Sequence, residues 1–424
     1  MGRLIQPLLK TNGHYQPTSW EEACRLIAEH SHSAQPNRTL VMTNGNYSNE
    51  ELYAIQRLAR TGLKTNALGS FDYYNRGTAF FIDKNDIVPY AELFGASRFY
   101  TLLNPKSEAL SQKTVLDILQ ACPNTPRYEF NTPDTLQIQD FGSFFRSVNQ
   151  YLIQNNLAKG IYIQGLGKNY DAYKERILAE DKQKLLKFNN LKSEYIKQFA
   201  DGLLSEEAPV FIIWEQFLDE HGIIELENMC MLLDIQAKPS TGFLSLKAEL
   251  NSQGLYDMGI FPDICVGGEP FDESNRRLME ELYGQTAHTD NIDLPTRIAT
   301  CDFDQCYLFN ATGAEIPQDI METANHCSWS VLQTACWDET GEYDLILPAS
   351  LPEECDGTFT DSTRAAHNSK ADATCPLPYD NLHLLSKMGE SFGLPVLDNP
   401  TDIFMEYISF FHAGCRSQQR HFFR

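Results

Sequence analysis

The stretch that decides the fold reads Asp344-Leu345-Ile346-Leu347-Pro348-Ala349-Ser350, and Asp356-Gly357-Thr358-Phe359 follows it closely. Residues 344–347 are typical of a buried strand, because an apolar run there ends at a proline. A strand that ends in this way delivers the chain to the carboxyl edge of a parallel sheet, where α/β folds bind ligands. Gly357 gives the freedom for a tight turn. We expect either a ligand-binding loop or a purely structural strand-to-loop corner here.

Strand and helix patterns alternate on both sides of this stretch. Two capping boxes, Ser19 with Glu22 and Ser48 with Glu51, mark the starts of helices, and Gly62 is expected to end the second one. Further strands are predicted at residues 38–42, 98–103, 209–214, 306–309 and 328–333. Further helices are predicted near 115–119, at 140–156, within 170–204, at 223–233 and at 318–324. This alternation predicts parallel sheets with helices on both faces.

A Gly/Pro-rich run from Lys238 to Pro270 interrupts this alternation. It is too long for a plain connection between two elements, so we expect a weakly structured functional or interface loop.

Composition excludes several classes of protein. The chain has 424 residues, which suffices for two or three domains, and a net charge of −23. Binding of nucleic acid needs a basic face, so no nucleic-acid partner is expected. The sequence has no run of eighteen apolar residues and no signal-peptide pattern at its start, so we expect no transmembrane segment and a cytoplasmic protein.

Candidate metal ligands and catalysts are also scarce. The eleven cysteines are scattered and form no CxxC pair, which favours reduced thiols packed as small hydrophobic groups over a metal site. Histidines such as His221, His326 and His367 are expected to lie on the surface or to be satisfied by neighbours. Paired acids are expected to be helix-start or solvated charges, namely Glu21/Glu22, Glu50/Glu51, Glu206/Glu207 and Glu353/Glu354. We therefore predict no catalytic residue and no metal ligand.

Four segments, taken in order, resemble one family. They are residues 2–8 with 12–13 and 19–23, residues 250–254 with 257–259 and Pro262, residues 344–350 with Glu353 or Glu354 and 356–359, and residues 401–407. They resemble motifs in the large subunits of molybdopterin oxidoreductases, of the formate dehydrogenase type. The same domains occur in degenerate form in the large iron–sulfur subunit of respiratory complex I.

The resemblance implies an α/β fold of two Rossmann-like domains with parallel sheets, the second and third domains of the formate dehydrogenase/DMSO reductase-type fold. It implies that the N-terminal iron–sulfur domain and the C-terminal β-rich cap of the family are lacking. We expect a leading segment at 1–19 and a closing helix and tail at 396–424. The first domain is expected at 20–125 plus 255–300, and the second at 130–250 plus 300–395.

The family also implies a cofactor, molybdopterin guanine dinucleotide. If this chain binds it, the matching motifs would supply Gln253, Gly254, Asp356, Gly357, Thr358 and Arg364. The family's molybdenum ligand, a cysteine or selenocysteine followed by histidine, would fall in Asp72–Thr78, where this chain has neither. The turns at 103–105 and 309–311 lack the family's glycines, and Glu249 replaces an amide. We therefore predict no cofactor, with the pterin dinucleotide as the alternative.

Three functions remain open. The first is a structural or assembly subunit of a multi-subunit redox complex, formate dehydrogenase-like or complex I-like, with iron–sulfur or flavin subunits as partners. The second is the cofactor-binding part of a split formate dehydrogenase, and the third is a module that handles the pterin cofactor. In the first case Asp356 should accept backbone donors, Arg364 should pair with a carboxylate or with carbonyls, and residues 4–9 should lie near a docking surface.

Overall fold

The computed structural model describes residues 2–81, 87–158, 160–166, 168–235, 239–337 and 341–414. The chain forms two compact units. Of the described residues, unit 1 comprises those up to 75, those from 249 to 361 and those from 366 to 414, and unit 2 comprises those from 76 to 248 and from 362 to 365. The chain therefore passes from unit 1 into unit 2 and back, and a short turn of unit 2 interrupts unit 1.

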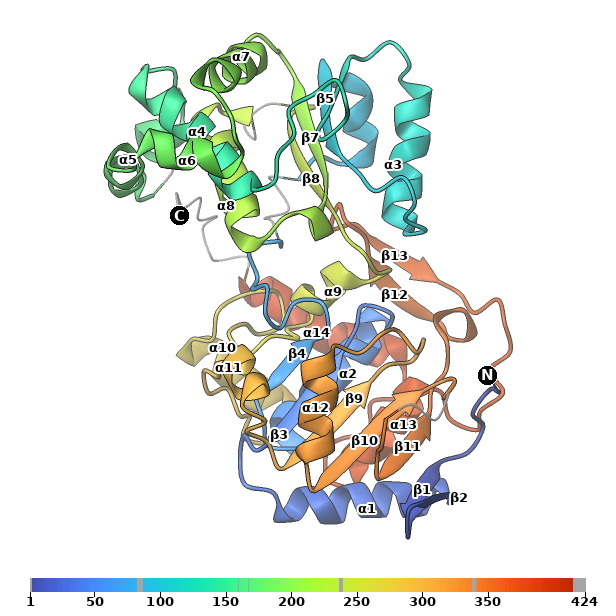
Figure 1. The fold of residues 1–424 in the computed structure, drawn as a ribbon. Coiled ribbons are helices and arrows are strands. Elements are labelled where there is room, and N and C mark those ends of the chain that lie inside the picture. Colours follow the sequence, from blue (N-terminus) through green and yellow to red (C-terminus); the bar gives the residue numbers. More distant parts are fainter. Residues whose placement is uncertain are drawn as a thin grey trace. The chain divides into compact units, whose positions relative to one another are not determined.

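Unit 1 is built on a seven-stranded sheet in the order β2-β1-β11-β10-β9-β3-β4 (Figure 1). Its strands are β1 (Leu8–Thr11), β2 (His14–Pro17), β3 (Thr39–Thr43), β4 (Leu68–Ser70), β9 (Gln305–Phe309), β10 (Trp329–Thr334) and β11 (Leu345–Pro348). The five strands from β11 to β4 are parallel, while β1 joins β11 antiparallel and pairs with β2 as a hairpin. The central strands are buried on both faces, which explains their continuous apolar runs.

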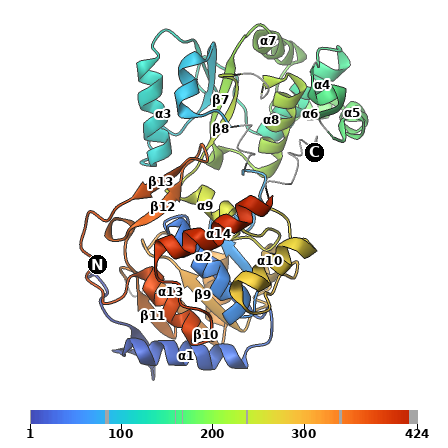
Figure 2. The ribbon, with the colours of Figure 1, turned by 180° about the vertical axis from the view of Figure 1, so that it is seen from behind.

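Helices cover both faces of this sheet. On one face α11 (Leu294–Ala299) and α12 (Gln318–His326) close a core that includes Met42, Leu308 and Leu332. On the other face lie α1 (Trp20–Ser33), α2 (Asn49–Arg57) and α13 (Asn381–Glu390). Figure 2 shows α2 and α13 in front of the strands together with α14 (Pro400–Gly414), and α1 along the lower end of the unit. Unit 1 also contains α9 (Ser252–Asp257), α10 (Glu273–Tyr283) and the hairpin of β12 (Gly357–Thr360) and β13 (Ala366–Ser369).

The two predicted capping boxes both start helices. Ser48 accepts from the backbone of Glu51, and the Glu51 carboxylate accepts from the backbone of Ser48 at 2.7 Å, so this box is complete. α2 continues through a π-helical turn (Leu58–Gly62) that ends at Gly62. The first box is only half formed: Ser19 accepts from Glu22, but the Glu22 carboxylate bonds Arg25.

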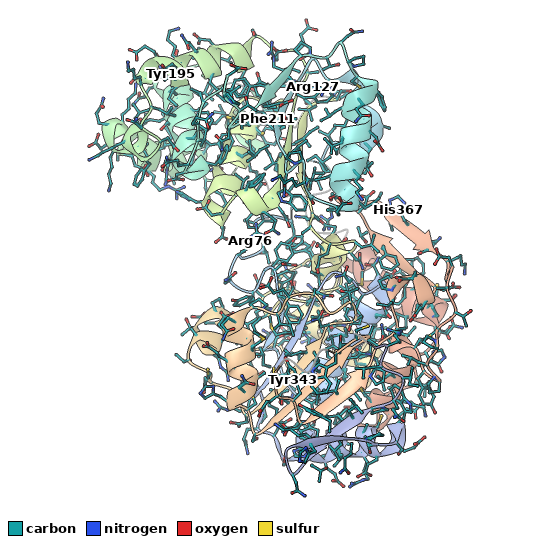
Figure 3. The ribbon with its side chains drawn as sticks, turned by 45° about the vertical axis from the view of Figure 1, so that its right-hand side comes forward. Arg76, Arg127, Tyr195, Phe211, Tyr343 and His367 are labelled. Atoms are coloured by element: carbon teal, nitrogen blue, oxygen red, sulfur yellow. The ribbon has the colours of Figure 1, made fainter. Side chains whose placement is uncertain are left out.

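Unit 2 has a four-stranded, fully parallel sheet in the order β6-β5-β7-β8. Its strands are β5 (Arg98–Leu102), β6 (Arg127–Glu129), β7 (Pro209–Trp214) and β8 (Gly242–Leu246). Its helices are α3 (Leu110–Ala121), α4 (Phe141–Gln154), α5 (Tyr170–Leu178), α6 (Lys182–Phe188), α7 (Ser193–Leu204) and α8 (Glu220–Leu232). Phe211, labelled in Figure 3, stacks on Tyr100 with 4.8 Å between ring centroids. Aromatic packing of this kind fills the space between the sheet and the α4 group of helices.

The prediction of an α/β fold with parallel sheets is confirmed, but the predicted boundaries differ from the observed units. β5 and α3, which we placed in the first domain, belong to unit 2, because β5 pairs with β7. The strands β9 to β11, which we placed in the second domain, extend the sheet of β3 in unit 1. The predicted loop at 238–270 contains β8 and α9, and Lys238 itself lies outside the described residues.

Among the residues that the structure describes, no helix combines the length and the apolar composition that a bilayer crossing requires.

Candidate functional site

The carboxyl edge of the unit 1 sheet is lined by amide side chains. Asn44 follows β3 and Asn310 follows β9, and because these strands are adjacent and parallel, both side chains meet at the same edge. Asn44 Nδ2 donates to Asn310 Oδ1 at 3.0 Å, and both residues are buried. Asn310 also accepts from the backbone of Ala314 and donates to its carbonyl, which fixes the turn after β9.

The turn after β3 directs two donors at a single carboxylate. The backbone N–H of Gly45 donates to Glu249 Oε2, and Asn46 Nδ2 donates to Glu249 Oε1 at 3.0 Å. The backbones also touch, since Asn251 N–H donates to the Gly45 carbonyl at 2.7 Å. A Cβ on Gly45 would meet the Ser252 backbone nitrogen at 2.7 Å, so this approach requires glycine.

A second set of buried amides connects α2, α9 and β12. Asn251 Nδ2 donates to the Tyr47 carbonyl at 2.8 Å and to Asn49 Oδ1 at 3.1 Å, and Asn251 Oδ1 accepts from Thr360 N–H at 2.7 Å. Gly254 lies against both amides: a Cβ there would meet the Asn49 and Asn251 Oδ1 atoms at 2.4 and 2.3 Å. The Asn-Ser-Gln-Gly sequence at residues 251–254 is thus used for close packing in this chain.

Glu50 holds the first residues of β12. Thr358 donates both its N–H and its Oγ1–H to the Glu50 carboxylate, at 2.9 and 2.7 Å. Thr358 Oγ1 accepts in turn from Asn49 at 3.2 Å. Gly357 is buried against α2, and a Cβ on it would meet Ser48 Cβ at 2.6 Å. The N-terminal end of α2 and strand β12 are therefore joined through a buried carboxylate, since Glu50 is only 2 % exposed.

The next residue, Glu51, is also buried, and its carboxylate bonds different partners. Its carboxylate closes the capping box, and burial raises the pKa of Glu51 to about 7, opposed by hydrogen bonds from Ser48 and Asn381. Asn381 also bonds Ser350, which lies two residues after the end of β11, through three hydrogen bonds. Of the two alternatives expected for the paired acids, the helix-start one holds for Glu50 and Glu51, since both lie in the first turn of α2 and both are buried, not solvated.

A groove of about 710 Å³ opens beside β12 and β13. Asp356 lies at this groove, half exposed, where it bonds Lys370 Nζ at 2.6 Å and accepts the Ala371 N–H at 2.9 Å. The lysine and this backbone donor hold the pKa of Asp356 below its usual value. The prediction that Asp356 accepts a backbone donor is confirmed. On the α14 side Tyr407 lines the groove, and burial raises its pKa to about 12.

Five of the six residues implied by the resemblance lie in unit 1, namely Asp356 at the groove and four others. Gln253, Gly254, Gly357 and Thr358 are buried or nearly so around Asn49. Gln253 donates to Asp257 at 3.1 Å. Arg364 differs, because it belongs to the short unit 2 turn between β12 and β13, where its φ is +59°. The residues that sequence reasoning missed here are Asn49 and Asn251, although Asn251 lies inside the family-like segment 250–254.

The carboxyl edge of the unit 2 sheet has a different chemistry. Lys247 follows β8 and Glu215 follows β7, and their side chains form an ion pair of 2.6 Å that is 3 % and 0 % exposed. Burial lowers the pKa of Lys247, and Glu215 opposes that shift. Arg76, labelled in Figure 3, donates to the carbonyls of Glu215 and Leu218 at 2.8 and 3.2 Å. Lys247 N–H donates to Ser362 Oγ at 3.0 Å, which brings the turn that carries Arg364 to this edge.

The stretch Asp72–Thr78, where the resemblance implies a metal ligand, follows β4. Tyr73 is buried and contacts Phe261, and Tyr74 donates to Asp319 at 2.5 Å. Within the described part of the chain, no three His, Cys, Asp or Glu side chains lie close enough together to hold a metal ion.

A sequence model of the molybdopterin oxidoreductase family matches residues 3–381 of this chain. The chain belongs to this family. One relative is the F420-dependent formate dehydrogenase 2 subunit alpha of Methanococcus maripaludis, which is 24 % identical over 410 residues, or 88 % of this chain and 60 % of the relative. Two Staphylococcus aureus relatives, whose names also refer to formate dehydrogenase, are 22 % and 23 % identical over 403 residues. This chain spans 60 % of the first relative's length and 40 % of theirs.

One solved structure has the same fold over most of its length. It is a chain of the formyltransferase/hydrolase complex (FhcABCD) from Methylorubrum extorquens, solved in complex with methylofuran. The TM-score is 0.59 at 11 % identity, and the match covers 91 % of this chain and 98 % of the other. At this identity the likeness concerns the fold alone.

Proposed function

We propose that this molybdopterin oxidoreductase family member is a structural or assembly subunit of a multi-subunit redox complex, formate dehydrogenase-like or complex I-like, and carries no catalytic centre of its own. The observation that carries the proposal is the hydrogen bonding of Thr358. Both of its donors, which lie in the loop that the resemblance assigns to the cofactor, are taken by the Glu50 carboxylate of the same chain. The Thr358 donors of this loop are therefore satisfied within the chain, as we expect for a loop that has a structural role and binds no ligand.

The residues at this edge of unit 1 fit the pterin dinucleotide of the family poorly. A pyrophosphate is a polyanion and is bound by backbone N–H groups and basic side chains. Here Glu50 and Glu249 place carboxylates on the Thr358 and Gly45 N–H groups. A phosphate in the same place would have to displace them or be repelled by them. Tyr73 and Tyr74 also stand in the stretch where the family has a thiolate or selenolate, which softer metals prefer as a ligand.

Partners of this chain are proposed to be iron–sulfur or flavin subunits. The Methanococcus relative is named as a subunit, and the solved structural neighbour is one chain of a complex. Near the start of this chain Ile5 is 58 % exposed, as we expect for a residue of a docking surface. In this proposal the chain serves as a scaffold, and the partner subunits carry out electron transfer.

The test is purification of the complex from its native host through a tag on this chain. We expect co-purifying iron–sulfur or flavin subunits by mass spectrometry, and no stoichiometric molybdenum or pterin assigned to this chain by elemental analysis and pterin fluorescence. A monomeric chain in native extracts would contradict the structural role. Stoichiometric molybdenum on this chain would instead support the split formate dehydrogenase, and pterin transfer to another protein would support the cofactor-handling module.

Arg364 provides a second test. Thermal melts of wild type and Arg364→Ala, with and without a guanine dinucleotide, should show no nucleotide-dependent shift. If Arg364 serves the fold, the substitution should destabilise unit 2 by about 1–3 kcal/mol, the usual cost of an unpaired buried partner. A nucleotide-dependent rise in wild type that disappears in Arg364→Ala would overturn the proposal in favour of a cofactor-binding enzyme.

A further inference from the structure

The turn after β3 holds an anion in the way that proteins hold a bound oxyanion. The Gly45 N–H and the Asn46 side-chain amide converge on the two oxygens of one carboxylate, that of Glu249. Each carboxylate oxygen accepts one of the two hydrogen bonds. Two donors therefore bind the carboxylate together, and the same arrangement suits the oxygens of a phosphate. The bound anion is a side chain of the same protein, and Glu249 lies more than two hundred residues after Gly45 in the sequence.

Other contacts hold Gly45 and Asn46 in the positions from which they donate. Gly45 is buried, and close contact with residues 249–252 leaves no room for a Cβ. The Asn251 N–H donates to the Gly45 carbonyl at 2.7 Å, which fixes the backbone on the other side of the same peptide segment. Asn46 is oriented by Asn44, whose Oδ1 accepts the Asn46 N–H at 3.2 Å. Its side-chain nitrogen also donates to Thr312 at 3.2 Å.

Glu249 and Asn46 are both only partly buried. A small anion from solvent therefore has a path to these donors, and the Glu249 side chain has room to leave them. The turn lies at the carboxyl end of a parallel strand, the place where α/β folds bind ligands. The Gly45 residue that supplies the backbone donor is itself buried, and a buried N–H without an acceptor is costly, so some acceptor is required.

We propose that Glu249 is a built-in occupant of an oxyanion site formed by Gly45 and Asn46, and that it excludes phosphate-bearing ligands from the end of β3. Removal of this one carboxylate opens a site for a small oxyanion of the phosphate class. The proposal goes beyond the structural role above, because it names the side chain that closes this edge and the class of ligand that it competes with.

The experiment uses the full chain, inorganic phosphate as the probe, and calorimetric titration with thermal melts as the readouts. Wild type should show no saturable phosphate binding. Glu249→Ala should bind one phosphate, with a Kd on the order of 1 mM, as expected for a few hydrogen bonds without a basic side chain. Glu249→Ala/Asn46→Asp should lose that binding, because one donor is replaced by a like charge. Glu22→Ala is the matched control: it removes an exposed carboxylate on α1 and should not create binding.

Amide hydrogen exchange at Gly45 gives a measurement that does not depend on calorimetry. The Gly45 N–H should be protected in wild type, exposed to exchange in Glu249→Ala, and protected again when phosphate is added. Glu249→Ser, whose shorter side chain also removes the carboxylate from these donors, serves if the alanine variant fails to fold, and it should show the same gain. A folded variant that neither binds phosphate nor loses protection at Gly45 would overturn the proposal, as would phosphate binding by wild type. Neither of these two outcomes bears on the proposed membership of a complex, which co-purification tests separately.

Discussion

The two sheets end in opposite chemistries at their carboxyl edges. In unit 1 the polar groups are amides and carboxylates: Asn49 and Asn251 bond each other, and Glu50 and Glu249 accept backbone N–H groups. In unit 2 the edge is held by a buried ion pair between Glu215 and Lys247. Hydrogen bonds, some between amides and some from backbone N–H groups to carboxylates, therefore fix the unit 1 edge, where each lost bond is costly by itself. The unit 2 edge depends on charge balance, which a single substitution can destroy.

The largest expected effect concerns the ion pair of unit 2. Glu215→Gln leaves the Lys247 ammonium buried without a counter-charge, which should destabilise unit 2 by about 3–5 kcal/mol. Urea unfolding measures it, with Trp214 as the fluorescent reporter, since the other tryptophans lie in unit 1. The double variant Glu215→Leu/Lys247→Met should recover most of the loss. A loss below about 1 kcal/mol in the single variant would mean that the pair contributes no more than a surface pair does.

Glu51 should make unit 1 sensitive to pH. Its pKa is raised to about 7 in the folded state from an ordinary value of 4.5, so the folded state binds the proton more tightly. Wild-type stability should therefore fall as pH rises from about 4.5 to about 7 and then stay level. Glu51→Gln cannot ionise, and relative to wild type it should gain on the order of 3 kcal/mol between pH 4 and pH 8.

The measurement for Glu51 is urea unfolding over that pH range. The matched control is Glu22→Gln, at the same position of the first turn of α1, where Arg25 lowers the pKa of the exposed carboxyl. This control should show no gain with rising pH. An equal pH response of the two variants would refute the burial argument.

The amide network of unit 1 should give an intermediate effect. Asn251→Ala leaves the Thr360 N–H and the Tyr47 carbonyl without their partner, at a cost of about 2 kcal/mol. The loss should appear equally at pH 5 and pH 8, since no charge is involved, and this separates it from the Glu51 effect. Asn155→Ala, at an exposed helix end, should change the free energy of unfolding by less than about 0.5 kcal/mol.

The smallest effect is expected at the groove. Asp356→Asn removes the exposed pair with Lys370 while the amide can still accept the Ala371 N–H, so the loss should stay below about 1 kcal/mol. The loss should shrink further in 1 M salt, which screens exposed charges. A salt-independent loss of several kcal/mol would show that Asp356 has a structural role comparable to that of Asn251.

Local elements were predictable from sequence, while the pairing of strands was not. Apolar runs marked β3, β7 and β11, and the Ser48 box marked the start of α2, because these signals depend on neighbours in the chain. The choice of partner strand depends on contacts between residues far apart in sequence, so β5 could not be assigned to β7 in advance. The hairpin β1–β2 was missed, although its turn, Asn12-Gly13 with φ values of +53° and +81°, is a strong hairpin signal.

The candidate site was predictable only in part. Motifs pointed to Gln253, Gly254 and residues 356–358, and the structure places these around α2. The carboxylates that satisfy them were not recognised: Glu50 was interpreted as a helix-start or solvated charge. A glutamate at the first turn of a helix has the same sequence signature whether it faces solvent or a neighbouring strand. Only the position of β12 decides between the two.

The N-terminal hairpin has a consequence for self-association. β1 pairs through Leu8 and Leu9 with β11, so the outer edge of the parallel sheet on that side is not open to another chain. An open strand edge is a template for strand addition by copies of the same protein, and proteins commonly cover such edges. β1 therefore protects the edge of β11 from pairing with another copy of the chain. A version of this chain without residues 2–17 should keep the parallel core of unit 1 but present β11 to its own copies, and fibrillar aggregation should follow.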